Sequence, residues 1–542
     1  MNGKISHALQ CLTILSATVC AALICTATDS ALSTVKVDVG ILEGGQTADG
    51  KVLFFKGIPY AAPPVGRLRW KAPQPVQPWQ GTRKATEFGP RAMQKHIYDD
   101  MIFLDSGPSE DCLYLNIWTP ALSSKERLPV MAYIHGGGEA GSSSEAKQDG
   151  ENLARKGIVV VSFNYRLNVF GFLSHPDLTK ESGHHSSGNY AFLDQIAALQ
   201  WVQRNIAAFG GDPANVTIFG ESMGSFSVCA LVASPLTKGL FSKAIGESGG
   251  FFGETLALSS HSISEKAGVQ FAASLGAHSI AEMRAMPAER LVNATAGDPE
   301  KMDTRFNPNI DGYFLPEDVS AIYARGAEGH VPLLAGWNAD EINAYVTLGP
   351  PRPTAASFAR QIRKEYGAAA GEILKLYPGT TDSEAVRSAG DLASDKWISF
   401  STWQWIVAHA ATANAPVYRY RFDTPVPVPE GTKFNGMPVT GKDIGARHAG
   451  EIVYVFGSLN SVNAPWQPAD WKLSDLMMTY WTNFARSGNP NGVGLPQWPK
   501  FEKSTGNQVM ILDGSGSKAV PEMHRDRYEF LAGWYAEQQR SK

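Results

Sequence analysis

The sequence predicts an α/β protein in which a mostly parallel sheet is covered by helices on both faces. Short runs of β-branched, aromatic and other apolar residues recur along the chain, and near-continuous apolar runs indicate strands buried on both faces. Longer segments with a helical pattern lie between them, such as 192–210, and this alternation favours a doubly wound sheet. The predicted strands span 129–135, 157–165, 215–220, 241–248, 330–337 and 416–423.

The other segments outline the rest of the fold. Residues 35–60 have the pattern of a small antiparallel meander. The stretch 255–410 is rich in helical patterns and is expected to form a cap over the carboxyl edge of the sheet, and the last helix is expected at 524–540. The chain has no repeat of fixed period and no clear linker, so we expect one domain over 28–542.

The first 27 residues have the pattern of a secretory signal peptide. Lys4 is the only Lys or Arg among the first dozen residues, and the segment from Ala8 to Ala27 is uncharged and mostly apolar. We therefore expect cleavage after Ala27 and an exported protein, periplasmic or secreted. A single membrane anchor is the alternative, because the apolar run approaches spanning length. No later stretch has that character, so no stable membrane insertion is expected once the signal is removed.

Composition excludes several classes of protein. Charged residues make up 18% of the chain and hydrophobic residues 43%, which is the reverse of a disordered chain. The net charge of −4 gives no electrostatic footprint for nucleic acid or an anionic membrane surface. Of five cysteines, only Cys112 and Cys229 remain after signal removal, and a core of this size needs no disulfide. The sequence carries no signal for an oligomeric state.

A nucleophile motif surrounds Ser222. The segment Gly220-Glu221-Ser222-Met223-Gly224 follows the predicted strand NVTIF and precedes the helical pattern SFSVCALVA. G-x-S-x-G is common by chance, but a strand before it and a helix after it are typical of a strained turn that exposes a serine at the top of a sheet. The alternative is an ordinary glycine-rich turn between a strand and a helix.

A second glycine motif follows the predicted strand PVMAYI. The run His135-Gly136-Gly137-Gly138 lets backbone N–H groups approach a substrate oxygen, as an oxyanion hole requires. The same glycines begin a G-x-G-x-x-G pattern, which is also found in dinucleotide sites. Such a site needs an acidic residue at the end of the next strand, and that strand ends in Asn-Tyr-Arg at 164–166. The oxyanion interpretation is therefore favoured.

A serine nucleophile needs a histidine base and a carboxylate that orients it, in the chain order Ser, acid, His for this architecture. His448 lies in the polar loop ARHAGEIVYVFG, ahead of a short predicted helix. Glu341 follows the predicted strand VPLLAGW, where a loop at the carboxyl edge is expected. For each residue taken alone, a solvated loop side chain is the alternative. If Glu341 is not the acid, Asp340 is the next candidate.

The chain from about 35 to 535 resembles the type-B carboxylesterases, the cholinesterase-like branch of the α/β-hydrolases. This resemblance implies an α/β-hydrolase fold with Ser222 as nucleophile, Glu341 as acid and His448 as base. The matching stretches are FKGIPYAAPPVGRLRW, SEDCLYLNIW, PVMAYIHGGG, VVVSFNYRLNVFGFL, GNYAFLDQIAALQWVQRNIAAFGGDPANVTIFGES, NIDGYFLP, GWNADE, HAGEIVYVFG and WTNFARSGNPN.

The resemblance also implies the residues around these three. The oxyanion donors would be the N–H groups of Gly137, Gly138 and Met223. Ser248 matches a supporting serine near these three residues, and Glu221 matches a carboxylate that lines the cleft. Two buried ion pairs are implied as well, Arg69 with Glu110 and Arg166 with Asp194.

Four positions depart from the family pattern. Ala92 replaces the partner cysteine of Cys112, so we expect two free thiols. Ile102 stands where cholinesterases carry a tryptophan for a quaternary ammonium, which argues against a cholinesterase. Met223 replaces the usual alanine, and Glu139 replaces an aromatic residue after the glycines. If Glu139 reaches the cleft, its charge favours neutral or cationic esters over anionic ones. The alternative is that it pairs with a base in a neighbouring loop.

Together these features predict an exported serine hydrolase that cleaves small-molecule carboxylic esters, with no metal and no organic cofactor. A lipase or an amidase acting through the same residues is the alternative among enzymes. A non-catalytic binding protein on the same fold is a further alternative, because fold alone does not determine function. Such a relative would be expected to lack the nucleophile or the base, and this chain has both.

Overall fold

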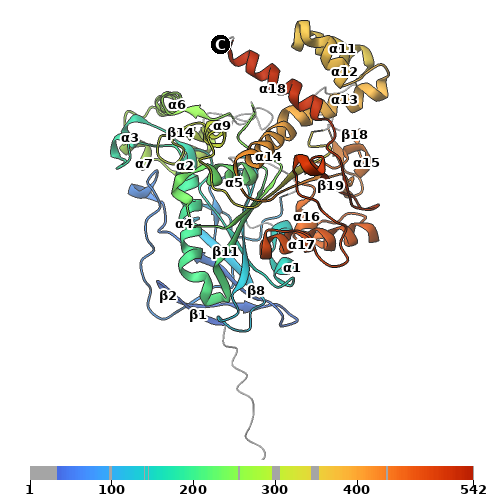
Figure 1. Ribbon diagram of the computed structural model, residues 1–542. Helices are drawn as coiled ribbons and strands as arrows, with labels where there is room; N and C mark the ends of the chain where they lie inside the picture. The colour runs from blue at the N-terminus through green and yellow to red at the C-terminus, as the bar shows by residue number, and fades with distance from the viewer. Residues whose placement is uncertain are drawn as a thin grey trace, which may run out of the picture.

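The computed structural model describes residues 33–96, 101–138, 141–143, 146–253, 257–295, 306–342, 353–434 and 437–540. Within these residues, eleven strands form one twisted sheet at the centre of the molecule (Figure 1). In spatial order the strands are β20 (Lys518–Val520), β19 (Val509–Leu512), β16 (Val417–Phe422), β15 (Leu333–Asn338), β12 (Lys243–Glu247), β11 (Gly211–Glu221), β9 (Leu128–Ile134), β10 (Val159–Phe163), β8 (Tyr114–Thr119), β4 (Leu53–Pro59) and β3 (Gly45–Gln46).

The strands from β10 to β19 pair in parallel, and the strands at both edges pair antiparallel. All six predicted strands belong to the parallel part. Its strands are almost continuously apolar because helices cover both faces. The α/β prediction is therefore confirmed.

Successive residues of each central strand enter two different cores. On β9, Ala132 and Ile134 pack in one core, while Met131 and Tyr133 pack in the other. Helices that contribute to the first core are α4 (Tyr190–Asn205), α5 (Met223–Ala233) and α14 (Phe400–Thr412). Those that contribute to the second are α1 (Glu151–Ala154), α16 (Ile452–Val455) and α17 (Pro468–Ser487), which Figure 1 shows on the opposite side of the sheet. This alternation holds the sheet between two layers of helices.

The predicted antiparallel meander divides between two sheets. Strands β1 (Thr34–Val37) and β2 (Gly40–Glu43) pair antiparallel, and β2 also pairs with β5 (Thr82–Lys84). These three strands form a separate small sheet. Strands β3 and β4 pair antiparallel at the edge of the large sheet. The antiparallel pairing was predictable from the sequence, but the separation into two sheets was not.

The helix-rich stretch also divides into two groups, with β15 between them in the sequence. The first group contains α6 (His261–Ser274), α7 (Ile280–Ala285), α8 (Ala288–Ala294) and α9 (Val319–Ala324). The second contains α11 (Ala355–Tyr366), α12 (Ala370–Leu376) and α13 (Asp382–Ser394), and it lies on the other side of the molecule in Figure 1. The second group has its own small core, against which the C-terminal helix α18 (Arg525–Arg540) also packs.

Both ion pairs implied by the resemblance are present. Arg69 binds Glu110 at 2.6 Å, and Arg166 binds Asp194 at 2.7 Å through side chains that are almost fully buried. Pairing offsets the cost of burying these charges. The two thiols Cys112 and Cys229 are free and buried.

The expected signal peptide, residues 1–27, lies outside the described residues. Among the residues that the structure does describe, no helix has both the length and the apolar character needed to cross a membrane.

Candidate active site

Three predicted residues meet at the carboxyl edge of the parallel sheet. Ser222 directly follows β11, Glu341 lies three residues beyond β15, and His448 lies in the loop that leads to α16. Because β11 and β15 run in the same direction, the loops after them emerge at the same edge. Ser222 and His448 are 226 residues apart in the chain, and the fold brings them together.

The turn at Ser222 is strained and needs its two glycines. Ser222 has φ 55° and ψ −124°, a conformation that side-chain-bearing residues rarely adopt. A Cβ on Gly224 would lie 2.0 Å from the carbonyl oxygen of Ile134, and one on Gly220 would lie 2.6 Å from the same atom. Only glycine lets strand and helix come this close to β9. The turn is further held by the Ser222 N–H, which donates to the Glu247 carbonyl at 2.8 Å.

Hydrogen bonds connect the three side chains in sequence. His448 Nε2 lies 2.9 Å from Ser222 Oγ, and His448 Nδ1 lies 2.6 Å from Glu341 Oε2. The other oxygen of Glu341 accepts hydrogen bonds from the Asn338 N–H at 2.7 Å and from the Ser248 hydroxyl at 2.6 Å. Because both oxygens of the buried Glu341 carboxylate are hydrogen-bonded, the orientation of this side chain is fixed. The resemblance implied a supporting serine near these residues, and the structure shows Ser248 in contact with the acid.

Two further groups contact the ring of His448. Glu221 Oε1 lies 3.2 Å from Nε2, and the indole of Trp397 packs edge-on against the imidazole at 4.6 Å between ring centroids. Burial lowers the pKa of His448, but the carboxylates of Glu221 and Glu341 oppose this, and the pKa is raised to about 9. The two carboxylates therefore stabilise the imidazolium form of His448.

Two buried glutamates that sequence reasoning missed lie near this group. The Glu451 carboxylate accepts a hydrogen bond from the Asn338 side chain, and that of Glu247 accepts one from the Trp481 indole at 2.7 Å. Burial, and then a neighbouring carboxylate, raises the pKa of Glu451 to about 7 and that of Glu247 well above its usual range. Glu451 lies three residues after His448, so its position was visible in the sequence, but nothing in the pattern distinguished it from a solvated loop residue.

The predicted oxyanion donors lie beside the strained turn. A Cβ on Gly136 would meet the Ser222 Cβ at 3.0 Å, so the glycine run passes in contact with the nucleophile turn. Gly137 and Gly138 have φ of 93° and 63°, values that glycine tolerates. Met223 begins α5, and the first N–H groups of a helix have no partner within the helix. Glu139 lies outside the described residues, so its predicted effect on substrate charge stays a prediction.

This arrangement has the chemistry of acyl transfer. It combines a hydroxyl, an imidazole within hydrogen-bond distance, a buried carboxylate on the other ring nitrogen, and backbone N–H groups near the hydroxyl. Within the described ranges, no three His, Cys, Asp or Glu side chains are grouped so that they could hold a metal ion.

The sheet order, the strained serine turn and the position of the histidine loop define an α/β-hydrolase fold. The chain belongs to the carboxylesterase family, whose model matches residues 31–531. It is 37% identical to the fumonisin B1 esterase of Sphingopyxis macrogoltabida, over 88% of this chain and 87% of that one. It is 36% identical to the para-nitrobenzyl esterase of Bacillus subtilis, over 86% of this chain and 92% of that one.

Solved structures agree with this classification. The crystal structure of a Geobacillus stearothermophilus carboxylesterase matches with a TM-score of 0.77 and 33% identity, and it covers 92% of this chain and 99% of its own. The protein is therefore a carboxylic ester hydrolase, and the resemblance inferred from the sequence is confirmed.

Proposed function

We propose that this carboxylesterase is an exported serine hydrolase that acts through an acyl-enzyme on Ser222. The observation that carries the proposal is the unbroken chain from Ser222 Oγ to His448 Nε2 at 2.9 Å and from His448 Nδ1 to Glu341 at 2.6 Å. A weakly acidic hydroxyl becomes a nucleophile when a neighbouring base removes its proton as it attacks.

In the first half-reaction, Ser222 Oγ attacks the ester carbonyl carbon, and its proton passes to His448 Nε2. The carbonyl oxygen gains negative charge, which the N–H groups of Gly137, Gly138 and Met223 stabilise. The imidazolium that forms lies between the carboxylates of Glu341 and Glu221. His448 then gives its proton to the leaving alcohol, and the bond between the carbonyl carbon and the alcohol oxygen breaks.

The second half-reaction repeats these steps with water. His448 takes a proton from the water, whose oxygen attacks the acyl carbon, and the collapse of the intermediate returns the proton to Ser222. The products are a carboxylic acid and the regenerated enzyme. The proton that Ser222 loses to the leaving alcohol is replaced by one from the water, so the proton transfers balance.

A p-nitrophenyl ester provides the direct test. When deacylation is slower than acylation, mixing enzyme with this substrate gives a burst of p-nitrophenol equal to the enzyme concentration. We expect such a burst, and we expect Ser222→Ala to lack it and to lose at least about 10³-fold in kcat. Turnover in Ser222→Ala close to that of the wild type would show that another group is the nucleophile.

Export is supported by the N-terminal sequence alone. Expression of the full chain with its natural N-terminus, followed by N-terminal sequencing of the exported protein, should give a mature chain that begins after Ala27. An uncleaved chain retained in the membrane fraction would instead support the alternative of an N-terminal anchor.

A further inference from the structure

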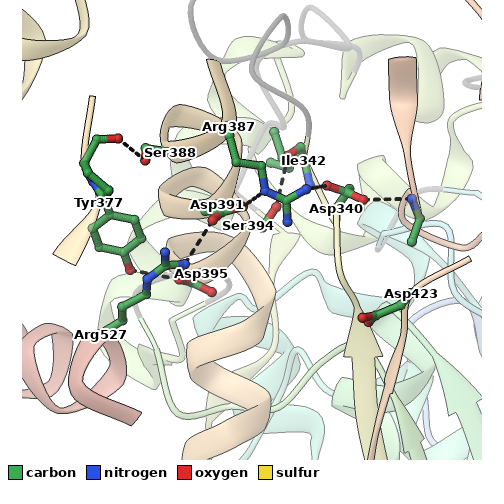
Figure 2. Close-up of polar contacts among 12 residues, drawn as sticks. Asp340, Ile342, Tyr377, Arg387, Ser388, Asp391, Ser394, Asp395, Asp423 and Arg527 are labelled. Atoms are coloured by element: carbon green, nitrogen blue, oxygen red, sulfur yellow. Dashed lines mark hydrogen bonds and ion pairs between the residues drawn. The ribbon is translucent and has the colours of Figure 1, made fainter. Parts of the chain in front are cut away.

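Both chain neighbours of Glu341 are hydrogen-bonded to helix α13. Asp340, which precedes it, accepts a hydrogen bond from Arg387 Nη1 at 3.2 Å. Ile342, which follows it, donates its N–H to Ser394 Oγ at 2.9 Å and accepts from the same hydroxyl at 3.0 Å. Figure 2 shows that the two contacts come from two positions along the helix, Arg387 and Ser394. The acid loop is therefore attached to α13 on both sides of the catalytic carboxylate.

Asp340 also joins the acid loop to the histidine loop. Its Oδ2 accepts a hydrogen bond from the Ala446 N–H at 2.9 Å, and its own N–H donates to the Ala446 carbonyl at 3.0 Å. Gly445 makes this approach possible, because a Cβ there would lie 2.2 Å from Asp340 Oδ2. Ala446 is two residues from His448. The carboxylate that sequence reasoning named as a reserve acid thus connects the two loops that carry the acid and the base.

Arg387 is held in place by neighbouring carboxylates. Its Nε donates to Asp391 Oδ1 at 2.8 Å, and Arg527 of α18 binds the other oxygen of Asp391 at 3.1 Å. Burial is the largest effect on the pKa of Asp340 and raises it, and the carboxylates of Asp391 and Asp423 act in the same direction. The Arg387 guanidinium and the Ala446 N–H oppose this and lower the pKa. Arg387 thus favours the charged form of Asp340, which is the stronger acceptor for the Ala446 N–H.

The same helix leads to the catalytic base. After Ser394, α13 continues into a π-helical turn, Asp395–Ser399, and Trp397 of this turn packs against the His448 ring. π-helical turns often occur at functional sites, where they redirect side chains. One continuous helical segment therefore contacts the acid loop at two points and the histidine ring at a third.

We infer that α13 positions the catalytic acid, with Arg387 acting through Asp340 and Ser394 acting through Ile342. These residues hold Glu341 at the short distance from His448 that imidazolium stabilisation requires. They act through chain neighbours of Glu341, and so they are positioning residues. The inference deepens the proposed function and rests on it, because it assumes that Glu341 is the acid.

The exposure of the Arg387 side chain makes the inference testable. The Arg387 side chain is 62% exposed, so its ion pair with Asp340 is expected to add little to the stability of the fold. A displaced acid, in contrast, slows catalysis, since a shift of about 1 Å can cost up to about 10²-fold in rate. Loss of kcat without loss of thermal stability is therefore the signature of positioning.

The experiment compares purified full-length variants on p-nitrophenyl butyrate and records kcat, KM and Tm. Asp340→Ala should lower kcat at least about tenfold with KM within about twofold, and Arg387→Met should lower it about three- to tenfold. Asp340→Asn keeps an oxygen acceptor for Ala446, so it should retain more kcat than Asp340→Ala. Arg387→Lys keeps the positive charge, so it should retain more kcat than Arg387→Met. Arg325→Met is the matched control: it removes a comparably exposed arginine paired with Glu317, away from the acid loop.

The outcomes separate this inference from the proposed function. If Asp340→Ala and Arg387→Met keep kcat within about twofold of the wild type, α13 does not position the acid. A loss of kcat that only follows Tm, or that Arg325→Met shares, would equally overturn the inference. Ser222→Ala, assayed in parallel, tests the proposed function itself: if it keeps its turnover, the serine mechanism fails whatever the α13 variants show.

Discussion

Glu221 Oε1 lies 3.2 Å from His448 Nε2, the same nitrogen that lies 2.9 Å from Ser222 Oγ. The base of the proposed mechanism therefore has a carboxylate beside the nitrogen that receives the serine proton. This charge has two opposite effects. It stabilises the imidazolium that forms during attack, and it holds the proton on the base of the resting enzyme to a higher pH.

Replacement of Glu221 with Gln should move the pH profile toward acid. Only the neutral imidazole accepts the serine proton, so kcat/KM should rise with pH as His448 loses its proton. Because the pKa of His448 is raised to about 9, the rise should lie above the range of roughly pH 6–7.5 expected for an ordinary histidine. Removing the Glu221 charge lowers this pKa, and the midpoint should fall by about one unit or more. Glu289→Gln, an exposed change on α8, is the control. An unmoved midpoint in Glu221→Gln would show that another group controls the rise.

Replacement of Glu341 with Gln should lower kcat far more than it changes KM. The Asn338 N–H and the Ser248 hydroxyl both need an acceptor, so the amide oxygen should face them and the NH₂ group should face His448 Nδ1. That nitrogen would then be held as an acceptor, which leaves the proton on Nε2, where the base must be free. We expect a loss of at least about 10²-fold in kcat. Steady-state kinetics with a circular dichroism check of the fold would test this, and a full kcat would place the acid elsewhere.

Replacement of Gly224 with Ala should destabilise the protein. The new Cβ would lie 2.0 Å from the Ile134 carbonyl oxygen, and backbone atoms cannot move aside as a flexible side chain can. We expect a loss of more than about 2 kcal/mol in the free energy of unfolding. Gly371→Ala is the matched control, because a Cβ there would have no neighbouring atom within 4 Å and the residue lies in helix α12. Alanine there should be neutral or stabilising by up to about 1 kcal/mol. Equal Tm values for the two variants would contradict this account of the turn.

The two thiols of the described residues should react only after unfolding. Cys112 and Cys229 are both buried, and burial raises the pKa of Cys229 to about 12 and that of Cys112 well above its usual range. Neither is a thiolate at neutral pH, so a thiol reagent should modify the native protein slowly. After denaturation without a reductant, both should react. Fast modification of the native protein, or fewer than two thiols after denaturation, would contradict the prediction.

The sequence predicted best those features that depend on local pattern. The parallel strands were visible as apolar runs, and Ser222 was visible because glycines, a strand and a helix surround it within a few positions. Glu341 and His448 were found by their places in the chain and by the resemblance. Their meeting with Ser222 could be expected, because the loops after parallel strands emerge at one edge of the sheet.

Features that depend on distances between remote segments were not predictable. Trp397 comes from the turn after α13 and reaches His448 across the fold, and no pattern in its own segment indicates this. The raised pKa of His448 depends on Glu221, which is remote from it in the chain, so the sequence pattern indicates only the range of an ordinary histidine. The role of Asp340 is similar: its neighbour Glu341 was recognised, but its contacts with Ala446 and Arg387 exist only in the folded molecule.

Covalent labelling tests the central claim most directly. An aryl organophosphonate should add one phosphonyl group per molecule, and peptide mass spectrometry should locate it on Ser222, because an activated serine attacks phosphorus as it attacks an ester carbonyl. Loss of ester hydrolysis should follow the extent of labelling one to one, and Ser222→Ala should take up no label. A label on another residue with parallel loss of activity, or full labelling of Ser222 with activity retained, would contradict the account.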